Sequence, residues 1–136
     1  MNRPPALDVW IVDDDASIRW VLERALKQAG MSPITFEDAD SAMSALRRGE
    51  PDVQVTDIRV PGPSGLELLD DVRMRRPKLP VIVMTAHSDL DSAVAAYQGG
   101  AFEYLPKPFD IDQAVELVRR AATQQLSVES ASESRR

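Results

Sequence analysis

The sequence predicts an α/β domain in which a parallel sheet is covered by helices on both faces, and two observations carry this prediction. Short apolar segments alternate five times with segments whose apolar residues recur at helical spacing. Acidic, hydroxyl or basic residues stand where several of these apolar segments end. Repeated strand–helix alternation is typical of a doubly wound sheet, whose right-handed crossovers bring the carboxyl ends of all strands to one edge.

The five expected strands are short and apolar. They are DVWIV at 8–12, SPITF at 32–36, DVQVTD at 52–57, LPVIVMTA at 79–86 and AFEYLPKPF at 101–109. The fourth is a continuous apolar run, which burial on both faces of a parallel sheet requires. Gln54 departs from that pattern inside the third strand, so its amide needs hydrogen-bond partners or a place at the edge of the sheet.

A helix is expected after each strand, because apolar residues gather on one helical face. The first helix ends at Gly30, the second at Gly49, and the fourth, within SDLDSAVAAYQGG at 88–100, at its two glycines. The last helix starts near Asp110. The faces consist, helix by helix, of Ile18, Val21, Leu22, Ala25, Leu26 and Ala29; of Ala42, Met43 and Leu46; of Leu66, Leu69 and Val72; of Leu90, Val94 and Tyr97; and of Ile111, Ala114, Val115, Val118 and Ala122.

Two further expectations concern packing and the end of the chain. Trp10 and Trp20 are expected to pack in the core or at its edge. The segment SVESASESRR at 127–136 is rich in serine and charge and has no apolar periodicity. We therefore expect one domain over residues 7–125, followed by a linker stub or disordered tail over 126–136.

Composition narrows the class of protein. The chain has 136 residues, 43 % of them apolar and 28 % charged, which suits one globular domain. It contains no cysteine, which excludes disulfides, a thiolate nucleophile and a cysteine-based zinc site. A net charge of −6 argues against direct binding to nucleic acid. No apolar run has the length of a membrane span or of a secretory signal, so the cytoplasm is the expected location.

Carboxylates gather where the strands end. Asp13, Asp14 and Asp15 follow the first strand, and Asp57 closes the third. Thr85 closes the fourth strand, and Lys107 stands between two prolines after the fifth. If the first and third strands are neighbours, the acids meet at the open edge of the sheet, where ligands of such folds bind. Crowded carboxylates suit Mg²⁺, which fills its remaining positions with water or phosphate oxygens.

This pattern allows specific chemistry. Asp57 is a candidate nucleophile, because carboxylates form acyl phosphates. The Lys107 ammonium and the Thr85 hydroxyl are candidates for contacts with the phosphoryl oxygens. Taken one at a time these residues have ordinary interpretations, since aspartate is common in helix caps and turns and lysine on surfaces. Together they predict a site for magnesium and a phosphoryl group.

The motifs VDDD, TDIRVPGPSG, VMTAHSD and YLPKPF, in this order, make the chain resemble the receiver domain of two-component response regulators. The resemblance covers roughly residues 7 to 125. DDDASIRWVLERAL and TAHSDLDSAVAAYQGGAFEYLPKPFDID are most similar to the nitrogen-regulation activators, which work with the sigma-54 form of RNA polymerase. The family resemblance implies a flavodoxin-like five-stranded sheet of order 2-1-3-4-5.

The resemblance also implies roles for individual residues. Asp57 would be the phosphoacceptor. Magnesium would be held by Asp13, Asp14, Asp57 and the backbone carbonyl of Arg59. Thr85 and Lys107 would contact the phosphoryl group, and Thr85 with Tyr104 would form a switch pair. The Lys107–Pro108 bond would be cis. The roles of Asp15 and of His87, the single histidine, stay open.

The function that the resemblance implies is a regulatory switch rather than an enzyme. A sensor kinase would supply the phosphoryl group from a phosphohistidine, and the domain would assist its own phosphorylation and dephosphorylation. Phosphorylation would shift the face formed by the fourth helix and fifth strand, and so control a transcription activator of nitrogen regulation. A dimer formed on phosphorylation is left open.

Other functions remain as alternatives. A magnesium-dependent phosphohydrolase would need a carboxylate two residues after the nucleophile, where this chain has Arg59. A flavodoxin-like nucleotide binder would need a first loop rich in glycine and hydroxyl residues. A degenerate receiver would lack the acceptor residues. Because no phosphate-binding G-x-x-x-x-G-K-[ST] motif occurs, we expect an isolated receiver whose ATPase and DNA-binding domains lie elsewhere in a longer protein, with a stand-alone receiver as the alternative.

Overall fold

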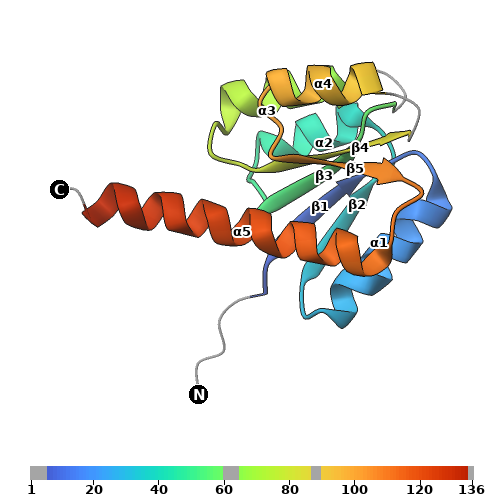
Figure 1. Cartoon of the computed structure of the whole chain (residues 1–136), viewed down its shortest axis with the longest axis horizontal. Helices are drawn as coiled ribbons and strands as arrows, with labels where there is room; N and C mark the ends of the chain where they lie inside the picture. Colours follow the sequence, from blue (N-terminus) through green and yellow to red (C-terminus); the bar gives the residue numbers. More distant parts are fainter. Residues whose placement is uncertain (1–5, 60–64, 87–89, 135–136) are drawn as a thin grey trace.

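Five parallel strands form a single sheet in the order β2-β1-β3-β4-β5, as the resemblance implies (Figure 1). The computed structural model describes residues 6–59, 65–86 and 90–134. Strands and helices alternate without exception along these ranges. Their bounds are β1 Asp8–Val12, α1 Ala16–Gln28, β2 Ser32–Phe36, α2 Ala39–Leu46, β3 Val53–Asp57, α3 Gly65–Arg75, β4 Val81–Ala86, α4 Leu90–Gln98, β5 Glu103–Lys107 and α5 Ile111–Ser134.

The helices cover both faces of the sheet and give the domain two cores. Helices α1 and α5 lie on one face, and α2, α3 and α4 lie on the other (Figure 1). Alternate residues of a strand serve the two sides, so that Val9 and Ile11 of β1 face α1 and α5 while Trp10 and Val12 face the opposite layer. The expected fold class is therefore confirmed.

Strands are added to the sheet in opposite directions on either side of β1 and β3, although all the strands are parallel. The connection from β1 runs through α1 to the edge strand β2, whereas the connection from β3 runs through α3 to β4 on the other face. This is the topological switch point of the sheet, because the helices that follow the two neighbouring strands, α1 and α3, lie on opposite faces. Ligand sites of such sheets lie at the carboxyl ends of the strands at this point.

Two of the three helices expected to end at glycine do so, whereas α2 ends at Leu46, before Gly49. Gly30 after α1 has a φ of 85°, and Gly100 after α4 has a φ of 100°. At both ends this glycine and the residue after it donate their N–H groups to carbonyls of the last turn, which is the Schellman arrangement. A Cβ on Gly100 would lie 2.9 Å from Cδ of Arg73, so α3 also packs closely against this turn. The α4–β5 turn therefore requires glycine for two independent reasons.

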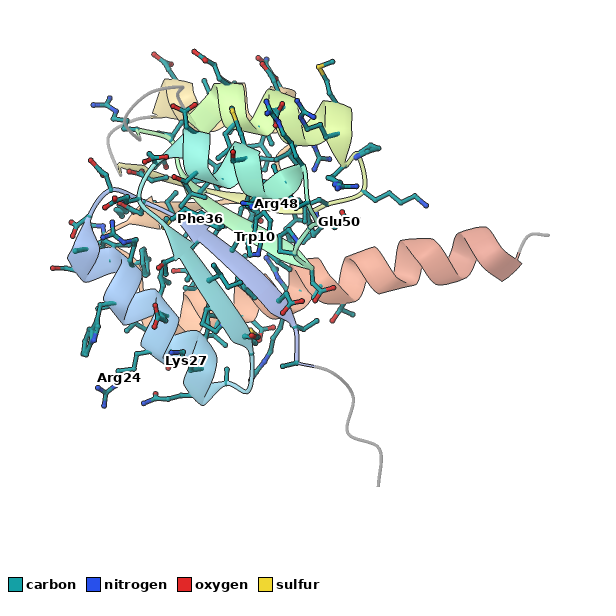
Figure 2. The ribbon with its side chains drawn as sticks, turned by 180° about the vertical axis from the view of Figure 1, so that it is seen from behind. Trp10, Arg24, Lys27, Phe36, Arg48 and Glu50 are labelled. Atoms are coloured by element: carbon teal, nitrogen blue, oxygen red, sulfur yellow. The ribbon has the colours of Figure 1, made fainter. Side chains whose placement is uncertain are left out.

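The two tryptophans have different environments. Trp10 is buried against Phe36 in an edge-to-face contact with ring centroids 5.2 Å apart (Figure 2). Trp20 is 61 % exposed, so its expected place in or beside the core is wrong. Its position on α1 is turned about 160° from Leu22, which is buried, because successive helical residues are about 100° apart. Its ring instead lies under the guanidinium of Arg24, 5.3 Å from the ring centroid.

Gln54 is fully buried in the central strand β3. Its amide Nε2 donates to the hydroxyl Oγ1 of Thr56 at 3.0 Å. Its Oε1 has no hydrogen-bond partner among the residues that the structure describes. The edge location is thus ruled out, and the required partners are only half supplied. An unsatisfied buried amide oxygen costs about 1–3 kcal/mol.

We expect Gln54→Leu to raise the free energy of unfolding by about 1 kcal/mol, because leucine fills a similar volume without an unpaired oxygen. Urea unfolding followed by circular dichroism measures this change. The double variant with Thr56→Val removes both hydrogen-bonding groups and should be at least as stable as the single variant. A Gln54→Leu protein less stable than the parent would show that the amide stabilises the core.

The last helix continues beyond residue 125. The backbone is helical through Ser134, so residues 126–134, expected as a linker stub or disordered tail, continue α5. Figure 1 shows that this part of α5 projects beyond the sheet. Among the side chains of α5 that the structure describes, those of Ala114, Val118 and Ala122 contact the core.

Candidate functional site

Asp13 and Asp57 lie side by side at the open edge of the sheet. The register of β1 and β3 pairs Val12 with Thr56, so the next residues of the two segments, Asp13 and Asp57, are also neighbours. Asp13 is fully buried, and 8 % of Asp57 is exposed. The backbone N–H of Asp13 donates to the carbonyl of Phe36 in β2 at 3.0 Å, which extends the sheet by one further pairing.

Lys107, the last residue of the edge strand β5, reaches both of these carboxylates. Its Nζ donates to Oδ2 of Asp13 at 2.7 Å and lies 3.6 Å from Oδ1 of Asp57. The Lys107–Pro108 peptide is cis, as expected. The ammonium therefore crosses from β5 to β1, over the ends of β4 and β3, and pairs with the innermost acid.

A third carboxylate completes the acidic group. Asp13, Asp14 and Asp57 each offer an oxygen, and these atoms lie within 4.8 Å of one another. Asp14 is exposed, so the group opens to solvent. Three carboxylates facing one ammonium leave a surplus of negative charge, and hard oxygen donors on an open edge suit Mg²⁺. The residues present thus fit a magnesium ion.

Asp15 has a different role from its two neighbours. It is the N-cap of α1, and its Oδ1 accepts from the backbone N–H groups of Ser17 at 2.8 Å and Ile18 at 3.4 Å. Its own backbone N–H donates to Oδ1 of Asp13 at 2.9 Å. The open question about the third acid is answered, since Asp15 starts the helix and steadies Asp13.

The environment shifts the pKa values of the central pair. Burial, followed by the charge of Asp13, raises the pKa of Asp57 above its usual range, although Lys107 and the backbone N–H of Arg59 oppose the rise. Burial alone would lower the pKa of Lys107, but the hydrogen bond and charge of Asp13, with a contribution from Asp57, outweigh it and raise the pKa. The lysine thus stays charged while Asp57 holds a proton more readily than an exposed aspartate does.

The structure also describes Thr85, Tyr104 and Arg59 among the other residues that the sequence singles out. Thr85 is buried at the end of β4, opposite Pro106 of β5. Tyr104 lies on the neighbouring strand β5, opposite Val83, and its ring meets that of Tyr97 on α4 edge-to-face at 5.5 Å. Arg59 is exposed just after β3. His87 lies outside the residues that the structure describes.

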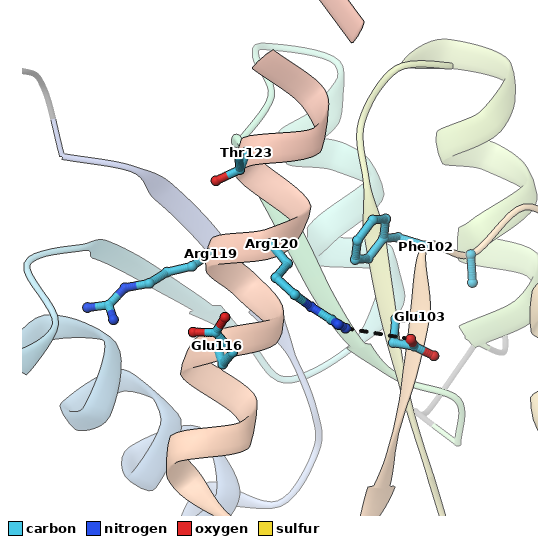
Figure 3. Close-up of a pocket in the computed structure, with 7 residues that line it drawn as sticks. Phe102, Glu103, Glu116, Arg119, Arg120 and Thr123 are labelled. Carbon is cyan, nitrogen blue, oxygen red and sulfur yellow. Dashed lines mark ion pairs between the residues drawn. The ribbon is translucent and has the colours of Figure 1, made fainter. Parts of the chain in front are cut away.

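Sequence reasoning missed a cluster on the α4–β5 face. Glu103 accepts from the hydroxyl of Tyr97 and from the backbone N–H of Tyr104, and its other oxygen lies 3.7 Å from Nη2 of Arg120. Figure 3 shows Arg120 reaching from α5 to Glu103, whereas Arg119 points away. Charged residues in an edge strand and an exposed helix carry no local signal of pairing, so only the fold reveals this link between α4, β5 and α5.

A groove lies apart from the acidic site. It has a volume of about 900 Å³ and runs along α5 beside the start of β5 (Figure 3). Its lining is Ala101, Phe102, Glu103, Glu116, Arg119, Arg120 and Thr123. Lys107 lies at the opposite end of β5, so the groove and the candidate metal site occupy different ends of the sheet.

Arg19 was also missed, although the sequence carries a signal for it. Its Nη1 donates to the backbone carbonyl of Asp13 at 2.7 Å. Its Nη2 lies 4.0 Å from Oε2 of Glu37, in the loop after β2. A cation near the start of a helix is opposed by the helix dipole, so a basic residue there is expected to have another partner.

A parallel sheet of order 2-1-3-4-5, with carboxylates after β1 and β3 and a lysine at the end of β5, defines the receiver class of signalling domain. The chain belongs to the response regulator receiver domain family, whose model matches residues 9–119.

Among named proteins, the chain is similar to the DNA-binding transcriptional regulator NtrC of Salmonella typhimurium, with 64 % identity over 113 residues. That alignment covers 83 % of this chain and 24 % of NtrC. It is also similar to the apo receiver domain of nitrogen regulatory protein C in solution, at 61 % identity and a TM-score of 0.79, covering 87 % of this chain and 95 % of that one.

A third relative is a structure described as a transiently phosphorylated "switch" in bacterial signal transduction. It shares 60 % identity with this chain at a TM-score of 0.77, and the match covers 88 % of this chain and 97 % of that one. The chain spans about a quarter of the length of the full-length regulators that it matches. None of the described helices has both the length and the apolar composition needed to cross a bilayer.

Proposed function

We propose that this chain is a phosphorylation-activated switch whose acceptor is Asp57. The observation that carries the proposal is the convergence of Asp13, Asp14 and Asp57 within 4.8 Å, with Nζ of Lys107 bound to the innermost acid. A carboxylate oxygen of Asp57 would bond to phosphorus while the P–N bond of a kinase phosphohistidine breaks and the imidazole leaves with the bonding electrons. The relative described as a transiently phosphorylated switch supports this reading.

The surrounding residues have separate tasks in this proposal. Magnesium, held by Asp13, Asp14, Asp57 and the carbonyl of Arg59, would neutralise the carboxylates and orient the phosphoryl oxygens. The Lys107 ammonium and the Thr85 hydroxyl would contact the transferred group. Asp13 itself is poorly placed to react, because it is fully buried and bonded to both Lys107 and the N–H of Asp15.

The output of the switch would be a change of surface rather than a product. Thr85 at the end of β4 and Tyr104 on β5 are the proposed switch pair, and Tyr104 contacts α4 through Tyr97. Movement of Thr85 toward the phosphoryl group would free space for Tyr104 and shift α4 against β5. The domain would assist its own phosphorylation and hydrolysis without being an enzyme for external substrates.

The biological setting is proposed from the relatives. Because the chain is similar to NtrC, we propose that it acts in the cytoplasm on transcription in nitrogen regulation, with a sensor histidine kinase as donor. ATPase and DNA-binding domains of a longer regulator would be its output, and α5 beyond residue 125 would lead toward them. Arg59, an exposed cation, occupies the place where a phosphohydrolase needs a general acid, and no observation favours that alternative.

Intact mass spectrometry after incubation with acetyl phosphate tests the proposal. We expect the protein to gain one phosphoryl group with Mg²⁺ and none with excess chelator. Because the pKa of Asp57 is raised in the metal-free protein, protons compete with Mg²⁺ for this carboxylate, so the rate of gain at subsaturating Mg²⁺ should fall on acidification. Donor consumption far faster than decay of the phosphoprotein would indicate a hydrolase, and no gain with no consumption would indicate a degenerate receiver.

A further inference from the structure

Asp13 is restrained by a hydrogen bond at each of its polar atoms, and the bond to its backbone carbonyl comes from Arg19, to which the proposed function gives no task. Its N–H bonds to Phe36, and its two carboxylate oxygens bond to the N–H of Asp15 and to Lys107. Its backbone carbonyl accepts the 2.7 Å hydrogen bond from Nη1 of Arg19. Arg19 therefore fixes the peptide that joins Asp13 to Asp14.

The Arg19 side chain is only 20 % exposed and reaches back from the first turns of α1 toward the β1–α1 loop. Nη2 lies 4.0 Å from Oε2 of Glu37, whose side chain is 74 % exposed, so this second contact is weak. The strong contact is the hydrogen bond to the Asp13 carbonyl, and the planar guanidinium gives that bond a direction that an ammonium does not fix in the same way.

We infer that Arg19 is a positioning residue for the magnesium site: it orients the Asp13–Asp14 peptide, and through it the two carboxylates that follow β1. The inference rests on the proposed function, since it assigns a task to Arg19 in the same site. Arg19 acts through the backbone of Asp13, because its hydrogen bond goes to the carbonyl of Asp13 and not to a carboxylate. Partners that orient ligands typically change metal affinity by about 10-fold to 100-fold when removed.

Charge and geometry make opposite predictions for this residue, which makes the inference testable. If Arg19 acted mainly as a positive charge near the site, Arg19→Gln would bind Mg²⁺ more tightly. If it acts by positioning, both Arg19→Gln and the charge-conserving Arg19→Lys bind Mg²⁺ more weakly, by about 10-fold for Gln. Arg24→Gln, on the same helix with its guanidinium over Trp20, is the matched control and should bind like the parent.

Isothermal titration of the metal-free protein with Mg²⁺ alone measures these affinities. A parent protein that binds no Mg²⁺ would overturn the proposed function and this inference together. A parent that binds, with Arg19 variants of unchanged or higher affinity, would overturn only this inference. Phosphorylation by acetyl phosphate should recover in Arg19→Gln at saturating Mg²⁺, because the acceptor itself is intact.

A second measurement does not require the metal. Hydrogen exchange of the Asp15 amide, which bonds to Oδ1 of Asp13, should be faster in metal-free Arg19→Gln while the urea midpoint stays near that of the parent. Unchanged exchange would overturn the inference. If Arg19→Gln fails to fold, Arg19→Lys is measured in its place, and faster exchange of the Asp15 amide together with weaker Mg²⁺ binding is again expected.

Discussion

Asp57→Asn is expected to abolish phosphoryl gain completely under conditions in which the parent protein is modified. The amide cannot act as the anionic nucleophile that forms an acyl phosphate. The neighbouring acids should not substitute for it. Asp13 is fully buried and bonded to Lys107, whereas Asp14 is exposed to solvent. Intact mass after incubation with acetyl phosphate and Mg²⁺ provides the measurement.

The control for this variant is Asp8→Asn, at the opposite end of β1, which should gain the phosphoryl group like the parent. Stability gives an independent check. Because the folded-state pKa of Asp57 is raised, the stability that its protonated form contributes is full below the ordinary aspartate pKa of about 3.9 and is lost as pH rises through the folded value. Asp57→Asn should therefore be more stable than the parent at neutral pH. A phosphoryl group gained by Asp57→Asn would move the acceptor to another residue.

Lys107→Met is expected to lower the free energy of unfolding by about 2 kcal/mol at neutral pH without metal. Removing one partner leaves two buried carboxylates facing each other without a cation, and breaking a fully buried pair costs about 3–5 kcal/mol. The expected cost is smaller because the lysine side chain is 25 % exposed. Urea unfolding in the presence of chelator gives the value, and Lys78→Met, an exposed lysine, is the control.

The dependence of stability on Mg²⁺ and on pH distinguishes a lost charge from lost packing in Lys107→Met. Mg²⁺ should stabilise the variant more than the parent, because the cation takes over the neutralisation of Asp13 and Asp57. In the parent, the raised pKa of Lys107 means that its stabilisation is complete below the ordinary lysine pKa of about 10.4 and is lost only as pH rises through the folded value. A deficit insensitive to Mg²⁺ would show that the lysine stem, and not its charge, stabilises the edge.

Side-chain contacts on the α4–β5 face link the proposed switch residue Tyr104 to helices α4 and α5. Glu103 joins Tyr97 of α4 to Arg120 of α5, and the ring of Tyr104 rests on Tyr97. Of the α4 side chains whose burial the structure describes, Ala93 and Ala96 are buried, whereas Val94 and Tyr97 are exposed. A helix whose buried side chains are small has low local stability, which suits an element that changes position.

Local sequence was sufficient for the elements and for the chemistry of the strand ends. Strand DVWIV and helix 16–28 follow from their apolar spacing and from Gly30 at the end of the helix, because caps and periodicity act within a few residues. The positions of Asp13, Asp57 and Lys107 at strand ends were readable for the same reason. The strand order followed only from the family resemblance, since nothing local specifies which strands pair.

Tertiary structure decided what the local pattern leaves open. Trp20 is apolar yet faces solvent, because the rotation of α1 is set by the whole buried face and not by one side chain. Gln54 lies in the central strand, where the pairing of β3 with both β1 and β4 leaves no edge for it. The separate roles of Asp14 and Asp15, and the contact of Arg19 with the Asp13 carbonyl, depend on how a loop turns between a strand and a helix. Contacts between residues as distant as Lys107 and Asp13 exist only once the sheet has assembled, and they determine the charge balance of the site.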